Sequence, residues 1–379
     1  MTLERNNTTL SPIIKWAGGK EKELPHILPC FPDTFNRYIE PFVGGGSVFL
    51  ATNSLRYFIN DLSDELIALY RCIATQEFSF FNYCHETAAA WDNATTFARG
   101  NNNLFDKYLD FRKGQINSDG IKVFIKNFCD REKPKIQSIV SGISFSIDYN
   151  VLRSEIQKNL TRKILRMKEL EKQRHLLPDE DIIDNIETAI KSALYMLLRH
   201  QYNETKDNAQ SPEHVALFFF IRNYCYSGMF RYNDKGDFNV PYGGMAYNGK
   251  RLEKKINYYK NNKLISQLNR ASFYNLDFEE FLIRVKPQRN DFVFLDPPYD
   301  SQFSTYAQNE FSRADQERLA GYLLNKCKAK WLLIIKNTDF IYNLYNKEGV
   351  NMKSFDKKYQ VSFMNRNDKA TTHLLISNY

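Results

Sequence analysis

The residues best suited to chemistry on an amino group follow an apolar run at 292–295. They are Asp296, Pro297, Pro298 and Tyr299. The run has the length and composition of a buried parallel strand, and ligands of open α/β sheets bind at the carboxyl ends of such strands. Two consecutive prolines make a stiff turn with carbonyl oxygens but no N–H groups. An exocyclic amino group could donate to these acceptors while its ring stacks on the tyrosine.

A glycine-rich segment at 40–49 is the second candidate site. Its glycines begin at Gly44, between a strand-like run and a helix-forming stretch. Glycines let the backbone approach a ligand closely, and an acid after the next strand, here Asp61, can accept hydrogen bonds from a ribose. Phe49 stands where a dinucleotide site has its third glycine, so a nucleoside ligand is favoured over a dinucleotide. A tight turn without a ligand is the alternative.

The third candidate, at 15–20, places Trp16 and two lysines around a flexible Ala-Gly-Gly. A phosphate-binding P-loop would need glycine at position 14 and serine or threonine at 21, but the chain has Ile14 and Glu21. The P-loop interpretation is therefore excluded. The lysines suit a ligand with a carboxylate, and the indole face suits a cationic sulfonium through cation–π attraction.

The elements that must position these segments alternate between strand and helix in the two ends of the chain, which predicts an α/β fold there. The expected strands are 37–40, 55–60, 291–295 and 331–335, the expected helices start at 48 and 313, and a hairpin is expected from 359–364 and 372–377.

The middle of the chain is more polar and predicts helices. Apolar residues recur at helical spacing, and basic residues outnumber acidic ones eight to three at 151–175 and seven to one at 250–270. A solvated helix face explains each basic run by itself, so the runs only support a polyanionic partner. The apolar stripe consists of Leu152, Ile156, Leu160, Ile164 and Met167.

Composition narrows the class of protein. The 379 residues are 43% hydrophobic and 25% charged, which excludes a disordered or collagen-like chain, and the net charge of +8 makes a polyanionic partner plausible. The six cysteines form no CxxC pair and the histidines no HExxH, so neither a metal site nor a disulfide framework is expected. Short apolar runs and the lack of an N-terminal hydrophobic signal core predict a cytoplasmic protein without membrane contact.

Taken together, the segments 15–20, 40–49 and 296–300 and the acid Asp61 resemble the Dam-type family (D12 class, alpha group) of DNA adenine-N6 methyltransferases. Their order along the chain also fits. In addition, 230–243 resembles the family's DNA-reading hairpin, and 372–379 resembles its closing strand. The resemblance covers about 11–75 and 215–379.

This resemblance implies a Rossmann-like sheet of an S-adenosylmethionine-dependent methyltransferase, built from 1–75 and 272–379. Residues 76–271 would form a mostly helical target-recognition region. It would contain a helical insertion at about 76–214 and a DNA-reading β-hairpin at about 228–243.

The resemblance also implies roles for single residues, with S-adenosyl-L-methionine as cofactor and no metal. The catalytic residues would be Asp296, Pro297, Pro298 and Tyr299. The cofactor would be bound by Trp16, Ala17, Gly18, Lys20, Phe42, Gly44, Asp61, Asp277, Phe278 and Asp296. Double-stranded DNA would be bound by Lys15, Arg231, Tyr232, Asn233 and Asn239, although 233–236 are also good turn formers.

The implied reaction is methylation of adenine N6, by base flipping and direct in-line attack, at a GATC-like site. The expected protein is a monomer in a prokaryotic or phage-infected cell, with a cognate restriction endonuclease left open as a partner. Three alternatives stay open: methylation of cytosine N4, methylation of another amino group in RNA or a glutamine amide, and a non-catalytic DNA-binding module.

Overall fold

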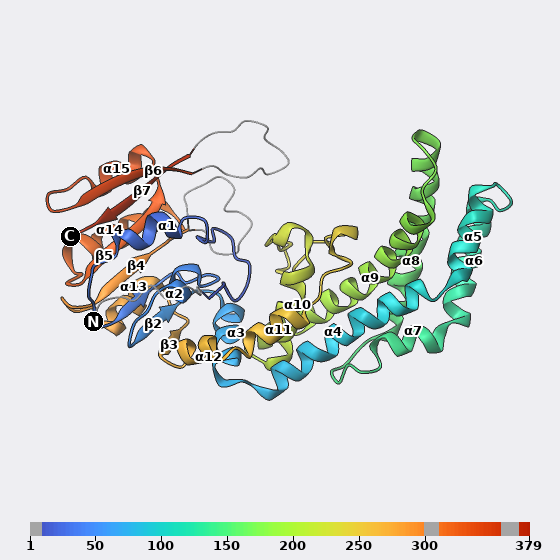
Figure 1. Cartoon of the computed structure of the whole chain (residues 1–379), viewed down its shortest axis with the longest axis horizontal. Helices are drawn as coiled ribbons and strands as arrows, with labels where there is room; N and C mark the ends of the chain where they lie inside the picture. The colour runs from blue at the N-terminus through green and yellow to red at the C-terminus, as the bar shows by residue number, and fades with distance from the viewer. Residues whose placement is uncertain (1–9, 299–310, 358–370) are drawn as a thin grey trace. The chain divides into compact units, whose positions relative to one another are not determined.

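The computed structural model describes residues 10–298, 311–357 and 371–379. The chain divides into two compact units, coloured by residue number in Figure 1. The sheet unit comprises Met1–Thr75 and Lys260–Tyr379, and the helical unit comprises Gln76–Tyr259. Residues 260–271, expected from the sequence in the middle region, therefore belong to the sheet unit.

The sheet unit is a Rossmann-like α/β structure, as the sequence predicts. Its described strands form one sheet in the order β3-β2-β1-β4-β5-β7-β6. The pairs among β3, β2, β1, β4 and β5 are parallel, whereas β7 runs antiparallel to both β5 and β6. The strands are β1 Tyr38–Glu40, β2 Tyr57–Asn60, β3 Ala271–Tyr274, β4 Phe292–Leu295, β5 Lys330–Lys336, β6 Asn351–Lys357 and β7 Thr371–Ser377.

Continuous apolar runs form the central strands because both faces of this part of the sheet are covered. All residues of β4 are buried, and Trp331 to Ile335 of β5 are buried as well. One face packs on helices through Phe281, Leu319 and Leu323. The described helices of this unit are α1 Leu24–Ile27, α2 Ser47–Ala51, α3 Asp64–Thr75, α12 Asn262–Leu268, α13 Phe278–Val285, α14 Arg313–Asn325 and α15 Asp339–Tyr345, with η1 Leu28–Cys30.

The predicted pairing of the C-terminal hairpin is wrong in its first strand, because both edges of the second strand are taken by β5 and by the segment 351–357. The second strand is β7, which pairs with β6 at 351–357. The expected partner at 359–364 lies outside the described residues.

The helical unit is built from long antiparallel helices. The helix α9 packs against both α8 and α4, and α10 packs against α4 and α9 (Figure 1). The predicted apolar stripe lies on α8, and all five of its residues are buried. The helices are α4 Phe78–Arg99, α5 Asn102–Arg112, α6 Ser118–Arg131, α7 Lys133–Val140, α8 Tyr149–Gln173, α9 Asp179–Glu204, α10 Pro212–Tyr224 and α11 Glu253–Tyr259, with η2 Lys206–Asn208, η3 Tyr226–Gly228 and η4 Met245–Tyr247.

A short hairpin lies between α10 and α11. Asn233 N donates to Asp237 O at 2.9 Å, and Asn239 N donates to Arg231 O at 3.0 Å. The turn between the arms needs glycine at Gly236, whose φ is +75°. Throughout the described residues, the helices are too short or too polar to cross a membrane.

Candidate active site

Three carboxyl groups follow neighbouring parallel strands of the sheet unit. Glu40 ends β1, Asp61 follows β2, and Asp296 follows β4. Since β1 pairs with both β2 and β4 in parallel, these three strand ends lie at the same edge of the sheet. The sequence predicted Asp61 and Asp296 as site residues, and the sheet order explains how residues so far apart in the chain share one edge.

Lys20 joins the segment 15–20 to the segment that starts at Asp296. Its Nζ lies 2.6 Å from Asp296 Oδ2 and donates to the Gly18 carbonyl at 2.6 Å. The lysine side chain is 2% exposed, whereas that of Asp296 is 18% exposed. The Asp296 carboxylate is thus paired with a buried lysine and is still partly open to solvent. The sequence predicted both residues, but not this ion pair.

The glycine loop packs directly on the segment that contains Trp16. Ile13 N donates to Gly45 O at 3.0 Å, and a Cβ on Gly45 would lie 2.4 Å from the Ile14 carbonyl oxygen. A Cβ on Gly44, where φ is +50°, would lie 2.8 Å from the Trp16 ring. Only glycine fits such close approach, so Gly44 and Gly45 and the segment of Ile14 and Trp16 depend on each other.

Asp61 holds the glycine loop from the other side. Gly44 N donates to Asp61 Oδ2 at 2.9 Å, and Ser63 N donates to Oδ1 at 3.0 Å. Burial raises the pKa of this carboxyl above its ordinary value, while the backbone N–H donors oppose the shift. Each carboxylate oxygen has a second lone pair, so Asp61 can still accept hydrogen bonds from a ligand.

Glu40 is the first residue of the segment 40–49, and the sequence analysis assigned it no role in the site. It is 2% exposed, and Tyr38 OH donates to its Oε2 at 2.8 Å. Burial raises the pKa of Glu40 well above its ordinary value. The charges of Asp296 and Asp61 add to this effect, and Lys20 opposes it. The sequence did contain a signal for Glu40, because a carboxylate stands at the end of an expected strand and shortly before the glycines.

Two buried amides tie the loops of this edge together, and sequence reasoning missed both. Asn60, 1% exposed, donates to the carbonyls of Pro41 at 3.0 Å and Leu276 at 2.9 Å, and its oxygen accepts from Leu276 N at 3.0 Å. Gln316 on α14 is fully buried and donates to the Pro298 carbonyl at 3.2 Å. A polar residue at the end of a buried strand was the signal for Asn60; α14 offered none for Gln316.

The remaining residues predicted to bind the cofactor differ in their burial and in their contacts. Phe42 packs against Phe278 with the rings tilted and 5.6 Å between their centroids, and Phe278 is almost fully buried. Asp277 caps α13 by accepting from Glu279 N at 2.9 Å and pairs with Arg318 at 3.0 Å. Of the segment 15–20, Trp16 is half-buried, and Lys15, Ala17 and Gly18 are exposed.

The predicted catalytic prolines differ in exposure. Pro297 is buried and Pro298 is exposed. The remaining predicted catalytic residue, Tyr299, lies outside the described residues.

The predicted DNA-contacting residues all lie on the hairpin of the helical unit, except Lys15. Arg231 is exposed, and its Nε donates to Asn239 Oδ1 at 2.6 Å. Tyr232 packs edge-on against Phe238, with 5.6 Å between ring centroids. The side-chain oxygen of Asn233 accepts from two backbone N–H groups of the turn, those of Lys235 and Asp237. Asn233 thus has the contacts of a turn former, which was the alternative noted from the sequence.

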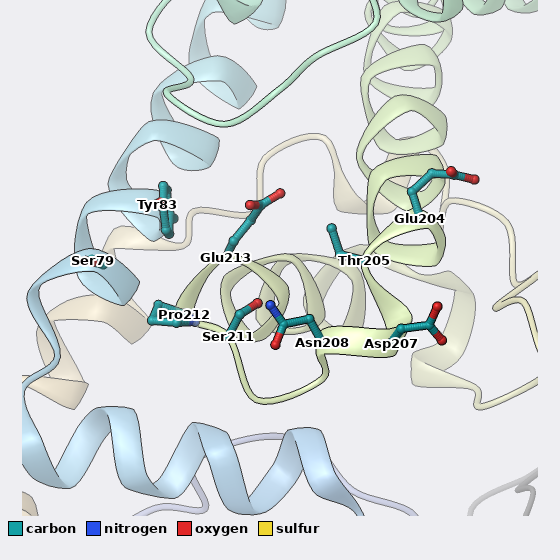
Figure 2. Close-up of a pocket in the computed structure, with 9 residues that line it drawn as sticks. All are labelled: Ser79, Tyr83, Glu204, Thr205, Asp207, Asn208, Ser211, Pro212 and Glu213. Carbon is teal, nitrogen blue, oxygen red and sulfur yellow. The ribbon is translucent and has the colours of Figure 1, made fainter.

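Two hollows of the described residues contain no predicted site residue. One, of about 450 Å³, lies in the helical unit between α4 and the α9–α10 connection (Figure 2). Its carboxyl groups, Glu204, Asp207 and Glu213, make it a poor site for a phosphate. The other, of about 1310 Å³, lies at the amino ends of the strands, beside Arg56 and Asn290. The candidate site is therefore defined by converging side chains at the carboxyl edge.

This edge defines a class of protein. A mostly parallel sheet with a close-packed glycine loop after β1, an acid after β2 and Asp-Pro-Pro after β4 is the arrangement of Rossmann-like methyltransferases.

Comparison with known proteins gives the family. The chain belongs to the D12 class N6 adenine-specific DNA methyltransferases, whose family model matches residues 16–162 and 146–361. It is therefore an adenine-specific DNA methyltransferase.

Similar proteins come from viruses, archaea and bacteria. The Type II methyltransferase M.CviBI of Paramecium bursaria Chlorella virus NC1A is 25% identical over 98% of this chain and 100% of its own. The Type II methyltransferase M.MjaIII of Methanocaldococcus jannaschii is 26% identical over 98% of this chain and 99% of its own. The DNA adenine methylase of Haemophilus influenzae is 25% identical over 88% of this chain and 82% of its own.

Proposed function

We propose that this enzyme transfers a methyl group from S-adenosyl-L-methionine to adenine N6 at a GATC-like site in duplex DNA, after flipping the base out. The observation that carries the proposal is the convergence of Glu40, Asp61 and Asp296 with the buried Lys20 at one edge of the sheet. The likeness to a DNA adenine methylase supports the choice of substrate.

The residues at this edge suit the cofactor. The left-handed Gly44 and Gly46 keep the loop free of side chains where it turns into α2, and Asp61 beside them keeps lone pairs for ribose hydroxyls. The carboxyl oxygens that follow β1, β2 and β4 offer acceptors for the α-amino group of the cofactor. The half-buried Trp16 offers an aromatic face to the sulfonium of the cofactor. When bound, S-adenosylmethionine supplies a methyl group made electrophilic by its sulfonium.

Asp296 and Pro297 act on the other reactant in this proposal. The N6 lone pair of adenine is delocalised into the ring, so it is a weak nucleophile. Hydrogen bonds from the amino group to the Asp296 carboxylate and the Pro297 carbonyl would favour tetrahedral geometry at N6 and expose the lone pair. Lys20 contributes by orienting Asp296 from the buried side. Catalysis is then mostly positioning and charge stabilisation.

Gln316 and Asn60 support this geometry from behind. Gln316 fixes the Pro298 carbonyl, and Asn60 fixes the loops that follow β1 and β3. Both are positioning residues in the proposal, because they act through the backbone of other residues. The predicted Tyr299 would stack on the flipped base, which returns about 1–3 kcal/mol against the cost of unstacking.

DNA reading is assigned to the hairpin of the helical unit. Arg231 is exposed and can contact a phosphate or guanine, although DNA would have to replace its bond to Asn239. Tyr232 is a candidate wedge into the base stack. Because Asn233 already serves the turn, we rank Arg231, Tyr232 and Asn239 above it. Two relatives named as Type II methyltransferases support a cognate restriction endonuclease as a partner in the cell, where both would act on cytoplasmic DNA.

The test is transfer of labelled methyl groups to duplex oligonucleotides that differ only at one GATC site. Digestion to nucleosides should give the label in N6-methyladenine, with at least about a tenfold preference for the GATC duplex. Label in cytosine, or in no nucleoside, would reject the chemistry. Label in adenine without the sequence preference would reject only the GATC assignment.

A further inference from the structure

The second arm of the hairpin, residues 237–240, has one edge paired with the first arm and one edge without a neighbouring strand among the described residues. Asp237 O and Asn239 N bond to the first arm at 2.9 and 3.0 Å. In an extended chain, alternate residues direct their backbone groups to opposite edges. Phe238 and Val240 therefore present their N–H and C=O groups away from the first arm.

Helix α9 satisfies these groups with side chains. Asn203 accepts from Phe238 N at 2.9 Å through Oδ1 and donates to Phe238 O at 3.2 Å through Nδ2. The Val240 carbonyl accepts from Tyr195 OH at 3.0 Å and from Arg199 at 3.1 Å. The three helix residues are spaced four apart, so they form one row along a single face of α9.

Two lysines make further contacts with the chain on either side of this segment, Lys206 from η2 and Lys191 from α9. Toward the turn, Lys206 donates to the Lys235 carbonyl at 3.1 Å and pairs with Asp237 at 2.7 Å. In the other direction, Lys191 donates to the Asn248 carbonyl at 2.6 Å. The hydrogen bonds from α9 to Phe238 and Val240 are shielded from water. Tyr195, Phe238 and Val240 are each at most 2% exposed.

We infer that Tyr195, Arg199 and Asn203 are positioning residues that set sequence specificity, with α9 taking the place of a third strand beside the hairpin. This inference rests on the proposed reading of DNA by the hairpin. An isolated two-stranded hairpin is only marginally stable in water, and a slip of one residue would turn every side chain to the opposite face. The row on α9 holds Arg231 and Tyr232 in one register and so determines how sharply the enzyme discriminates between sites.

The experiment compares Asn203→Ala with Asn185→Ala in the full-length enzyme. Asn185 lies on the same helix, and its amide donates within the helix, to Asp181 O at 2.8 Å. Four quantities are measured for each variant: amide hydrogen exchange at Phe238, cofactor affinity, KM and kcat for the preferred duplex, and the ratio of kcat/KM between that duplex and one with a single base pair changed.

We expect Asn203→Ala to speed exchange at Phe238, to raise KM for DNA about 10-fold and to lower the discrimination ratio by a similar factor, because two hydrogen bonds are lost. Cofactor affinity should stay within about twofold, since α9 lies in the helical unit. Asn185→Ala should match the wild type in all four. Tyr195→Phe removes one hydrogen bond to the Val240 carbonyl and leaves that of Arg199. Exchange at Phe238, KM for DNA and the discrimination ratio should change in the same directions, each by about a third of the fold-change expected for Asn203→Ala.

Two results would overturn the inference: unchanged exchange at Phe238, or faster exchange with unchanged KM and discrimination. If Asn203→Ala does not fold, the nearly isosteric Tyr195→Phe decides by the same criteria. Failure of the proposed function has a different signature. In that case Arg231→Ala would leave KM and discrimination at wild-type values, whatever the exchange at Phe238 shows.

Discussion

Two buried carboxyl groups at the carboxyl edge of the sheet are held in a different way from two carboxyl groups in the helical unit. In the sheet unit, burial raises the pKa of Glu40 and Asp61, and their described hydrogen bonds come from a hydroxyl and from backbone N–H groups. In the helical unit, burial alone would also raise the pKa of Glu187, but Lys191 and Arg99 outweigh it and the net pKa is lowered.

Glu171 of the helical unit repeats the pattern of Glu187. Arg112 lies 2.6 Å from its Oε1, Leu177 N donates to the same oxygen at 2.9 Å, and the pKa is lowered despite burial. Pairing each buried acid with a cation makes these groups structural. At the carboxyl edge of the sheet, by contrast, Glu40 and Asp61 have raised pKa values and accept their described hydrogen bonds from a hydroxyl and from backbone N–H groups. Carboxyl groups perturbed in this way are typical of reactive sites.

The comparison predicts that replacing one acid in each unit damages different properties. The largest effect is expected for Asp296→Asn, which keeps the size of the side chain but removes its charge. We expect kcat for methyl transfer to fall about 10²–10³-fold, because an electrostatic contact to the reacting amino group is lost. Steady-state kinetics with duplex DNA measures it.

Asp339→Asn is the control for that substitution. Asp339 is an exposed residue in the first turn of α15, outside the site. It should leave kcat within about twofold. An Asp296→Asn enzyme as active as this control would remove Asp296 from the mechanism and end the contrast between the units.

The next effect is expected on stability, from Glu187→Gln. This change leaves Lys191, 1% exposed, without its anion at 2.8 Å, and removes the acceptor of Arg99 Nε at 2.7 Å. Removing one partner of a buried pair costs about 3 kcal/mol or more. Urea unfolding of the helical unit should show this loss, while cofactor affinity stays unchanged.

Glu180→Gln is a matched control, because Glu180 pairs with the same Arg99 from the surface, where its side chain is 67% exposed. We expect it to cost no more than about 0.5 kcal/mol. Equal losses for Glu180→Gln and Glu187→Gln would mean that burial of the pair does not matter, contrary to the comparison.

The sequence predicted the parts of the site that depend on local rules. Short apolar runs located β1, β2, β4 and β5, and a parallel sheet then brings Asp61 and Asp296 to one edge. The stripe on α8 was equally predictable, because helical periodicity is a local property.

What sequence reasoning missed depends on contacts between distant segments. The ion pair of Lys20 with Asp296 joins residues far apart in the chain, and neither segment alone indicates its partner. The row on α9 was missed for the same reason: tyrosine, arginine and asparagine at a spacing of four resemble an ordinary polar face until the hairpin is seen against them.

The smallest effect tests the comparison most directly, through the sign of a pH dependence. Because the pKa of Glu40 is raised in the folded protein, its contribution to stability is present below its ordinary value of 4.5 and is lost as the pH rises through the raised pKa. For Glu187, whose pKa is lowered, the contribution is present above 4.5 and is lost as the pH falls through the lowered pKa.

In Glu40→Gln, the free energy of unfolding should therefore fall less steeply as the pH rises above 4.5. In Glu187→Gln, it should fall less steeply as the pH drops below 4.5. Each change in slope is at most about 1.4 kcal/mol per pH unit. Urea unfolding across this range, with hydrogen exchange followed separately in β1 and α9, assigns each slope to its unit. If both variants altered the slope on the same side of pH 4.5, the two units would not differ in how they hold buried acids. Effects on opposite sides of pH 4.5 would support the contrast between the raised pKa of Glu40 at the carboxyl edge of the sheet and the lowered pKa of Glu187 in the helical unit.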